Sequence, residues 1–326
     1  MTNTNSHAVS GGAIRRIRVQ TADVGTDGRL GAGTLLEWVE STAHVTAASW
    51  CGGSCVLASV GTFHLDRPIT AGDLVELHAD LVLTGHTSLH VLITICANCP
   101  DFGGEPQTAQ CPMVFVALGN LGHPAGVPTW TPTTMLELQR HRQARVRAIM
   151  RTRIESAMAA RSYQHTNTSG TTLRFRAGQT DVDRDGNVRG GRVLRWIDEV
   201  AYACGAAWAG SDVIASYLAG IRFAEPIVIG DAVDVTARII HTRPRSVHCS
   251  IDCTRIEDGE PRVLSYGLVV LVALDESGEP RAVPQWLPNS DTDRLLERHA
   301  RDLIELRQFI EPFSSVVPFA EHQRGA

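Results

Sequence analysis

The stretch from residue 186 to residue 208 carries groups that can polarise a carbonyl and position a water molecule. A turn holding Asn187 leads into Gly190-Gly191, and an apolar helix follows. A helix N-terminus offers unpaired N–H groups and partial positive charge, and glycines let a substrate oxygen approach that backbone. We predict an oxyanion hole at Gly190 and Gly191, with Asn187 orienting water or binding the carbonyl. The alternatives are that the glycines only permit tight packing and that Asn187 only shapes the turn.

Two carboxylates lie on apolar helices at matched positions. Asp198 belongs to the stretch above, and Glu40 belongs to a second version of it, from residue 28 to residue 50, at an offset of 158. Burying a carboxylate is costly unless it is paired or functional, and desolvation raises its pKa, which makes it a better base near neutral pH. Glu40 and Asp198 are therefore candidate catalytic residues. The alternative is a structural carboxylate that bonds the partner helix.

The duplication extends over most of the chain. Six tryptophans fall into three matched pairs, which are Trp38 with Trp196, Trp50 with Trp208 and, at an offset of 156, Trp130 with Trp286. Self-similarity over such a length predicts two copies of one fold.

Each copy predicts one helix and an antiparallel sheet, which is an α+β fold with the sheet wrapped around a central helix. In the first copy we expect strands at 14–19, 56–65, 74–83, 87–97 and 110–120, with the helix at 33–50. A charged helical stretch follows each copy, at 133–160 and 291–311. The predicted divisions are 11–132 and 171–290 for the two domains, 133–170 for a helical linker, and 291–326 for a terminal helix and tail.

Composition narrows the class of partner. The net charge of −5 gives no electrostatic reason to expect nucleic acid, and no apolar run approaches the length of a membrane helix. We expect a cytoplasmic protein without membrane association. The eight cysteines show no paired zinc spacing, so we expect reduced structural thiols and no metal.

The second copy resembles a known family. Its pattern is Asn-x-x-Gly-Gly, then Asp198-Glu199 on the helix, then Pro226-Ile-x-x-Gly-Asp on the sheet. This pattern is similar to that of the hotdog acyl-CoA thioesterases, and two copies in one chain resemble the double-hotdog acyl-CoA hydrolases. The resemblance covers about 13–132 and 171–288, and is weaker in the first copy. It implies tandem hotdog folds paired as an intramolecular pseudo-dimer, with both sheets joined into one.

The resemblance also implies two sites at the interface, each built from both copies. One site would combine Asn187, Gly190 and Gly191 of the second copy with Glu40 of the first. The shared arrangement implies that neither copy holds a complete site.

The other implied site would combine Arg29, Ala32 and Gly33 with Asp198. Here arginine replaces the asparagine of the family pattern. We predict that Arg29 pairs with Asp198 and silences this site. The alternative is that Arg29 binds a carboxylate or phosphate of the substrate.

Coenzyme A is the implied non-acyl part of the substrate, and no separate cofactor is expected. Its phosphates suit arginine, and we predict contacts from Arg222, Arg243, Arg245 and His86. The alternative is that they are solvated loop residues. The resemblance further implies a homo-oligomer of double-hotdog units.

The predicted reaction is hydrolysis of an acyl-CoA thioester to a carboxylic acid and CoA, with Glu40 as general base or nucleophile. One alternative is a hotdog protein that binds acyl thioesters without catalysis. Another is dehydration of an acyl thioester, which needs a histidine base. His44 follows Glu40 by four residues, but Tyr202 stands at the matched position, which weakens that alternative.

Overall fold

A computed structural model describes residues 6–9, 12–25, 27–64, 68–98, 107–120, 122–159 and 170–310. The first repeat and the long helix after it contain β1 Ser6–Val9, β2 Gly12–Arg18, α1 Ala32–Cys51, β3 Cys55–Val60, β4 Phe63–His64, β5 Leu74–Thr84, β6 Ser88–Ala97, β7 Gln107–Ala117 and α2 Met135–Ala159. The second contains β8 Gly170–Arg176, α3 Gly190–Ala209, β9 Val213–Phe223, β10 Ala232–Arg243, β11 Ser246–Glu257, β12 Glu260–Ala273 and α4 Asp291–Ile310.

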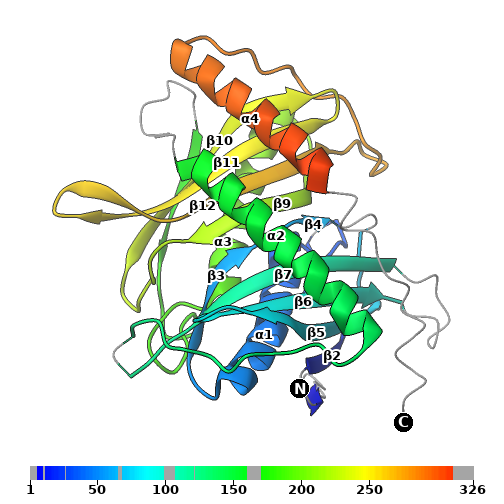
Figure 1. The fold of residues 1–326 in the computed structure, drawn as a ribbon. Helices are drawn as coiled ribbons and strands as arrows, with labels where there is room; N and C mark the ends of the chain where they lie inside the picture. The colour runs from blue at the N-terminus through cyan, green and yellow to red at the C-terminus, as the bar shows by residue number, and fades with distance from the viewer. Residues whose placement is uncertain are drawn as a thin grey trace.

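One antiparallel sheet runs through both repeats (Figure 1). Its strand order is β1-β2-β5-β6-β7-β3-β9-β12-β11-β10-β8, with β4 paired to β9 off this path. The two halves meet where β3 pairs with β9, at Ser59 with Arg222 and Val60 with Ile221. The prediction of an α+β fold with two hotdog units joined into one sheet is confirmed.

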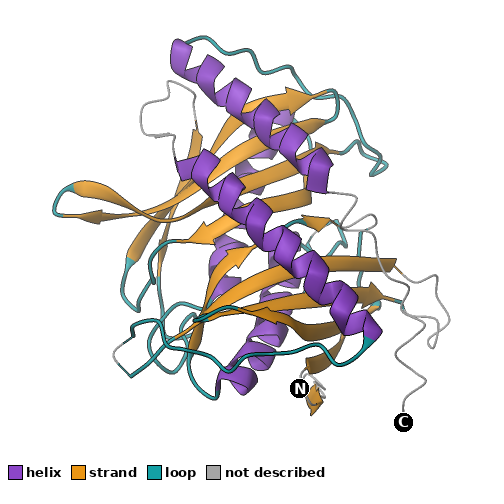
Figure 2. Cartoon of the chain, viewed as in Figure 1, coloured by secondary structure: helices purple, strands orange, loops and turns teal. Residues whose placement is uncertain are grey.

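The central helices α1 and α3 lie on one face of this sheet, and α2 and α4 lie on the other (Figure 2). Both central helices bury mainly aliphatic side chains against the strands, among them Leu36 and Leu194 with no exposed surface. These contacts form one continuous core that spans both repeats. Removing this apolar surface from water is the main stabilising contribution to the paired units.

Glycines allow α1 and α3 to contact each other directly. A Cβ built on Gly33 would lie 2.9 Å from Arg195 Cα, and a Cβ built on Gly191 would lie 2.9 Å from Glu37 Cα. These contacts are equivalent under the repeat offset, so the helices are related by pseudo-two-fold symmetry. The close approach brings the beginning of each helix to the second turn of the other.

The strand predicted at 56–65 is interrupted. The residue at the break, Gly61, packs on β7, because a Cβ there would lie 2.6 Å from Pro112 Cγ. The chain then leaves β7, and Phe63 pairs instead with Leu218 of β9. Alternation of side chains could not show this change of partner, since it depends on β9 from the other repeat.

The charged helices cover the outer face of the sheet. Arg140 of α2 donates to Asp80 Oδ2 at 2.7 Å. On the same strand Glu76 and His78 are buried, with His78 Nε2 at 2.7 Å from Glu76 Oε1. Arg16 donates to both oxygens of Glu76, at 3.1 and 3.2 Å. The polar side of β5 is therefore an ion-paired layer beneath α2.

The prediction that all cysteines are reduced is wrong for Cys96, which forms a disulfide. The other six cysteines of the described ranges are free.

Candidate active site

Each central helix begins without a side-chain cap, and a carboxylate from the opposite helix takes that place. The N-cap residues are Gly31 for α1 and Arg189 for α3, both extended, and neither position has a side-chain cap hydrogen bond. The Gly33 N–H donates to Asp198 Oδ2 at 2.8 Å. The Gly191 N–H donates likewise to the Glu40 carboxylate. Unpaired N–H groups and the helix dipole favour an anion there.

The Glu40 carboxyl is the more buried of the two, with 4% of the residue exposed. Burial raises the pKa of Glu40 to about 7. The Gly191 hydrogen bond and the positive charge of Arg189 lower that pKa, while Glu37 and Asp183 raise it. A carboxyl that ionises near neutral pH can accept a proton from water without being permanently protonated.

This burial makes a prediction about stability. The pKa of Glu40 in the folded protein exceeds the 4.5 of an ordinary glutamate side chain. Protonation of Glu40 therefore favours folding below pH 4.5, and this stabilisation is lost as the pH rises through about 7. We expect Glu40→Gln to raise the free energy of unfolding by up to about 3 kcal/mol at pH 8 and to change it little at pH 4. Urea unfolding at both pH values tests this, and an equal change at both would contradict it.

Asp198 lies in the equivalent environment at the other helix. Burial raises the pKa of Asp198 to about 6, and Glu199 adds to this effect. The Gly33 hydrogen bond and the charge of Arg195 lower the pKa. Arg195 also reaches across to α1, where its Nη1 is 3.4 Å from Glu37 Oε2. Both matched carboxyls are thus held in comparable positions by the opposite copy.

Asn187 lies in the turn that leads into α3. Its N–H donates to Asp183 Oδ1 at 3.0 Å, and its carbonyl accepts from the Asp183 N–H at 2.8 Å. Gly186 supplies the left-handed conformation in this turn, with φ of 83°. The turn is therefore shaped by Asp183 and Gly186, and no described residue hydrogen-bonds the Asn187 carboxamide. That amide remains available to a ligand.

The two predicted glycines have different surroundings. A Cβ on Gly190 would lie 2.5 Å from Leu57 Cδ2, so Gly190 allows α3 to pack on β3. A Cβ on Gly191 would lie 3.1 Å from Glu40 Oε2. The packing alternative therefore applies to Gly190, whose oxyanion role stays a prediction, while Gly191 already orients the carboxylate.

The predicted pairing of Arg29 with Asp198 is wrong. Arg29 Nε lies 3.9 Å from Asp27 Oδ2, and the guanidinium packs against Gly278. The cation that acts on Asp198 is Arg195. The reason is geometric: Asp198 is bonded by Gly33 inside the helix interface, whereas the Arg29 side chain leaves the interface toward a turn of the other repeat.

The four residues predicted to bind CoA do not gather at one place. Exposed His86 lies in the β5–β6 turn, whose next residue, Thr87, accepts from Ala117 N–H. Leu118, the residue after Ala117, donates its N–H to the carbonyl of Ser54. The hydroxyl of Ser54 in turn donates to Asp185, in the loop before α3. His86 therefore lies at the end of the molecule that holds the Glu40 carboxylate and Asn187.

Arg243 and Arg245 lie at the opposite end. The Arg245 carbonyl accepts from Ala273 N–H, and the next residue, Leu274, donates to Asp212 at the end of α3. Arg222 lies at neither end, because it is on β9 next to the core residue Ile221. Side chains alternate between the two faces of a strand, so the Arg222 side chain is on the outer face of the sheet. The structure therefore does not bring these arginines together with His86, and the CoA contacts of all four residues stay predictions.

Sequence reasoning missed three residues around Glu40. Ser54 anchors the loop before α3 through Asp185, and Asp183 and Arg189 set the local charge. The spacing Asp183-x-Asp185-Gly-Asn187, typical of a side-chain-stabilised turn, could have indicated Asp183. Ser54 gave no signal, because its partner is 131 positions away.

The chain has two hotdog units, and the carboxylate on each central helix is bonded by the N-terminus of the other helix. This arrangement defines a tandem-hotdog protein. The profile of the thioesterase superfamily matches residues 28–98 and 185–261. Acyl-coenzyme A thioesterase 11 of Mus musculus is 24% identical over 86% of this chain and 50% of its own length. The cytosolic acyl coenzyme A thioester hydrolase of Mus musculus is 22% identical over 88% of this chain and 80% of its own.

A solved structure shares this fold. It is a Lactobacillus plantarum protein, provisionally assigned as an oleoyl thioesterase, with a TM-score of 0.58 at 11% identity, over 84% of this chain and 98% of that one. The chain belongs to the thioesterase superfamily and carries two hotdog units of that superfamily in tandem. It spans about half the length of the first relatives it matches. Within the described residues, no helix is long and apolar enough to cross a membrane.

Proposed function

We propose that the protein hydrolyses acyl-CoA thioesters, with Glu40 as the general base. The observation that carries this proposal is a buried carboxylate, that of Glu40, whose pKa is raised to about 7 and which accepts a hydrogen bond from Gly191 at the N-terminus of α3. The names of the relatives agree with this reaction class.

Each residue of the site has a place in the reaction. Glu40 accepts a proton from water, and the resulting hydroxide attacks the thioester carbonyl. The Asn187 carboxamide and the Gly190 N–H donate to the developing oxyanion, where each such donor contributes on the order of 3–4 kcal/mol in well-studied hydrolases. The C–S bond then breaks, the CoA thiolate takes up the proton from Glu40, and the carboxylic acid leaves.

Position rather than charge supports the assignment of Asn187. Its carboxamide is engaged by none of the described residues, while the loop that bears it is held at both ends. Asp185 accepts from Ser54 at one side, and the Val188 N–H donates to the Ile227 carbonyl at 2.7 Å at the other. A rigid loop with a free amide can bind a carbonyl without a large ordering cost.

The test is thiol release from a panel of acyl-CoAs of increasing chain length, followed optically between pH 5 and 9. We expect kcat to rise with pH through about 7, because Glu40 must be ionised to act as a base. A protein variant with Asn187→Ala should lose roughly 10²–10³-fold in kcat, as expected for loss of one oxyanion donor. Absence of thiol release from every acyl-CoA would overturn the proposal.

We further propose a cytosolic homo-oligomer. A relative is named as cytosolic.

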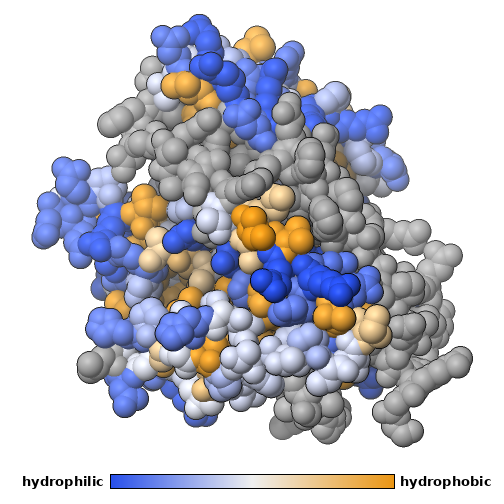
Figure 3. Space-filling model, viewed as in Figure 1, coloured by the Kyte–Doolittle hydropathy of each residue, from blue (hydrophilic) through white to orange (hydrophobic). Residues whose placement is uncertain are grey.

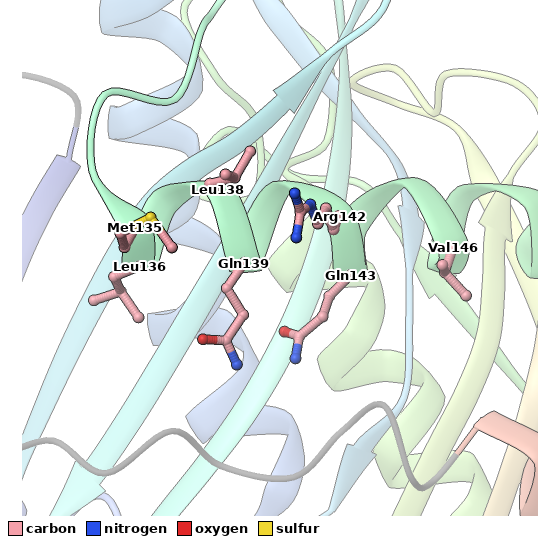
Figure 4. Close-up of a pocket in the computed structure, with 7 residues that line it drawn as sticks. All are labelled: Met135, Leu136, Leu138, Gln139, Arg142, Gln143 and Val146. Carbon is pink, nitrogen blue, oxygen red and sulfur yellow. The ribbon is translucent and has the colours of Figure 1, made fainter.

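The outer helix α2 exposes Met135 by 80% and Ile149 by 60%, and hydrophobic and hydrophilic side chains alternate over it in Figure 3. A groove of about 490 Å³ follows one side of α2 (Figure 4). It lies across the sheet from Glu40, so it suits contacts between copies rather than substrate. Light scattering on the purified protein tests this; a monomer at micromolar concentration would contradict it.

A further inference from the structure

Two free thiols lie beside the candidate active site, at the junction between α1 and β3. Cys51 is the last residue of α1, and Cys55 is the first residue of β3. Their side chains are in hydrogen-bond contact with each other. Cys55 is also close enough to Glu40 and Asp183 for the charges of both to act on it. No step of the proposed reaction uses these thiols.

The two thiols differ in exposure. Cys51 is partly exposed, whereas Cys55 is buried, with 3% of the residue exposed. Among the free cysteines of the described ranges, Cys51 is the only one that is not buried. Burial raises the pKa of the Cys55 thiol, and the contact with Cys51 adds to this effect. A dissolved oxidant therefore meets Cys51 first, while Cys55 stays a protonated thiol within reach of it.

The second repeat has no such pair. At the repeat offset of 158, the matched residues are Ala209 and Val213. The two junctions are otherwise alike, since Gly52 and Gly210 each end their helix in the left-handed conformation, with φ of 67° and 62°. The thiols are therefore not required to build such a junction, and they occur only in the repeat that carries Glu40.

Ser54 connects this junction to the loop before α3. It stands next to Cys55, and its hydroxyl donates to Asp185, two residues before Asn187. Ser54 belongs to the short segment that joins the two cysteines, so a bond between the sulfurs would close a small ring that includes it. A change in that ring therefore moves the hydroxyl that holds the Asn187 loop.

The strand side of this ring is fixed, and the helix side has room to move. Cys55 is paired with Ala117 of β7, and its carbonyl lies 3.1 Å from His44 Nε2. On the helix side, apart from its chain neighbours, no heavy atom of the described residues lies within 4 Å of a Cβ built on Gly53. A disulfide needs its sulfurs about 2 Å apart, which is closer than any hydrogen-bond contact, so the shift falls on Cys51 and the residues after it.

We propose that Cys51 and Cys55 form a reversible disulfide that lowers the activity when the protein meets a peroxide. The Cys51 sulfur attacks one oxygen of hydrogen peroxide, the O–O bond breaks, and one water leaves, which gives a sulfenic acid at Cys51. The Cys55 sulfur then attacks the Cys51 sulfur, the S–O bond breaks, and the second water leaves with the Cys55 proton. Two electrons pass from the thiols to the peroxide. The effect on activity rests on the proposed function, whereas formation of the bond does not.

Peptide mapping by mass spectrometry tests the bond itself. After treatment with hydrogen peroxide, we expect the peptide that contains Cys51 and Cys55 but no other cysteine to lose two hydrogens, and to regain them with dithiothreitol. Cys51→Ala and Cys55→Val introduce the residues of the second repeat, so both variants should fold, and neither should show this change. Oxidation of Cys51 to a sulfinic acid without a disulfide would overturn the inference. A disulfide in its place between Cys204 and Cys249, the other free thiols in contact with each other, would overturn it as well.

An activity assay tests the consequence for the active site. Hydrolysis is followed by the loss of thioester absorbance after the peroxide has been removed, so oxidation of the released CoA does not interfere. We expect the oxidised native protein to be slower by at least about tenfold, because a displacement of about 1 Å in a site can cost about 10²-fold, and to recover with dithiothreitol. Both variants should keep their activity with and without peroxide. Full activity in a protein that carries the disulfide contradicts the inference. Failure of the reduced protein to hydrolyse any acyl-CoA would instead count against the proposed function, while the peptide mapping still decides whether the disulfide forms.

Discussion

Glu40→Gln should lower kcat by roughly 10²–10⁴-fold, the range that a positioned general base contributes. Glutamine keeps the size of the side chain and can still accept the Gly191 hydrogen bond, so the helix interface should remain folded. KM should change much less than kcat, because Glu40 acts on water rather than on the bound CoA. Thiol release at pH 8, with circular dichroism to confirm folding, measures both parameters.

Asp198→Asn is the matched control for this variant. Asp198 has the same contact with the opposite helix, through Gly33 at 2.8 Å, but the loop before α1 carries Arg29 where the loop before α3 carries Asn187. We expect it to keep at least half of the native kcat. An equal loss in both variants would show that the two sites act together, and would refute the assignment of the reaction to Glu40.

The second large effect is expected for Gly191→Ala. The added methyl group would lie 2.9 Å from Glu37 Cα and 3.1 Å from Glu40 Oε2, so α1 and α3 must separate. Overpacking of this kind costs about 1–3 kcal/mol of stability. Separation also withdraws the N–H that orients Glu40, so activity should fall by about 10²-fold or more.

Gly33→Ala is the control that separates the loss of stability from the loss of activity. Its methyl group would lie 2.9 Å from Arg195 Cα and 3.0 Å from Asp198 Oδ2, which is the same steric conflict at the other carboxylate. Both variants should lose similar stability in urea unfolding, and only Gly191→Ala should lose most of its activity. Activity should be compared at urea concentrations below the unfolding midpoints of both variants. If both variants then lose activity equally, the loss comes from general disruption of the helix packing, and Gly191 has no special part in catalysis.

Much of the fold could be predicted because the pattern is local and is repeated. The matched tryptophans and the alternation on β5 and β10 identify two copies of one strand–helix–sheet unit, since each unit must bury one helix face against one sheet face. The positions of Glu40 and Asp198 on apolar helices were equally visible. The split of β3 from β4 was not, because Phe63 pairs with a strand from the other repeat.

The residues alone indicate which groups are present: a carboxylate on each central helix, glycines at both helix beginnings, and an asparagine in one copy replaced by Arg29 in the other. Which of these groups meet depends on how the two repeats pack in the folded chain. Gly191 bonds Glu40 rather than Asp198, because the helices cross with their glycines in contact. Arg29 packs on Gly278 rather than pairing with Asp198, and no local pattern encodes a contact between residues about 250 positions apart.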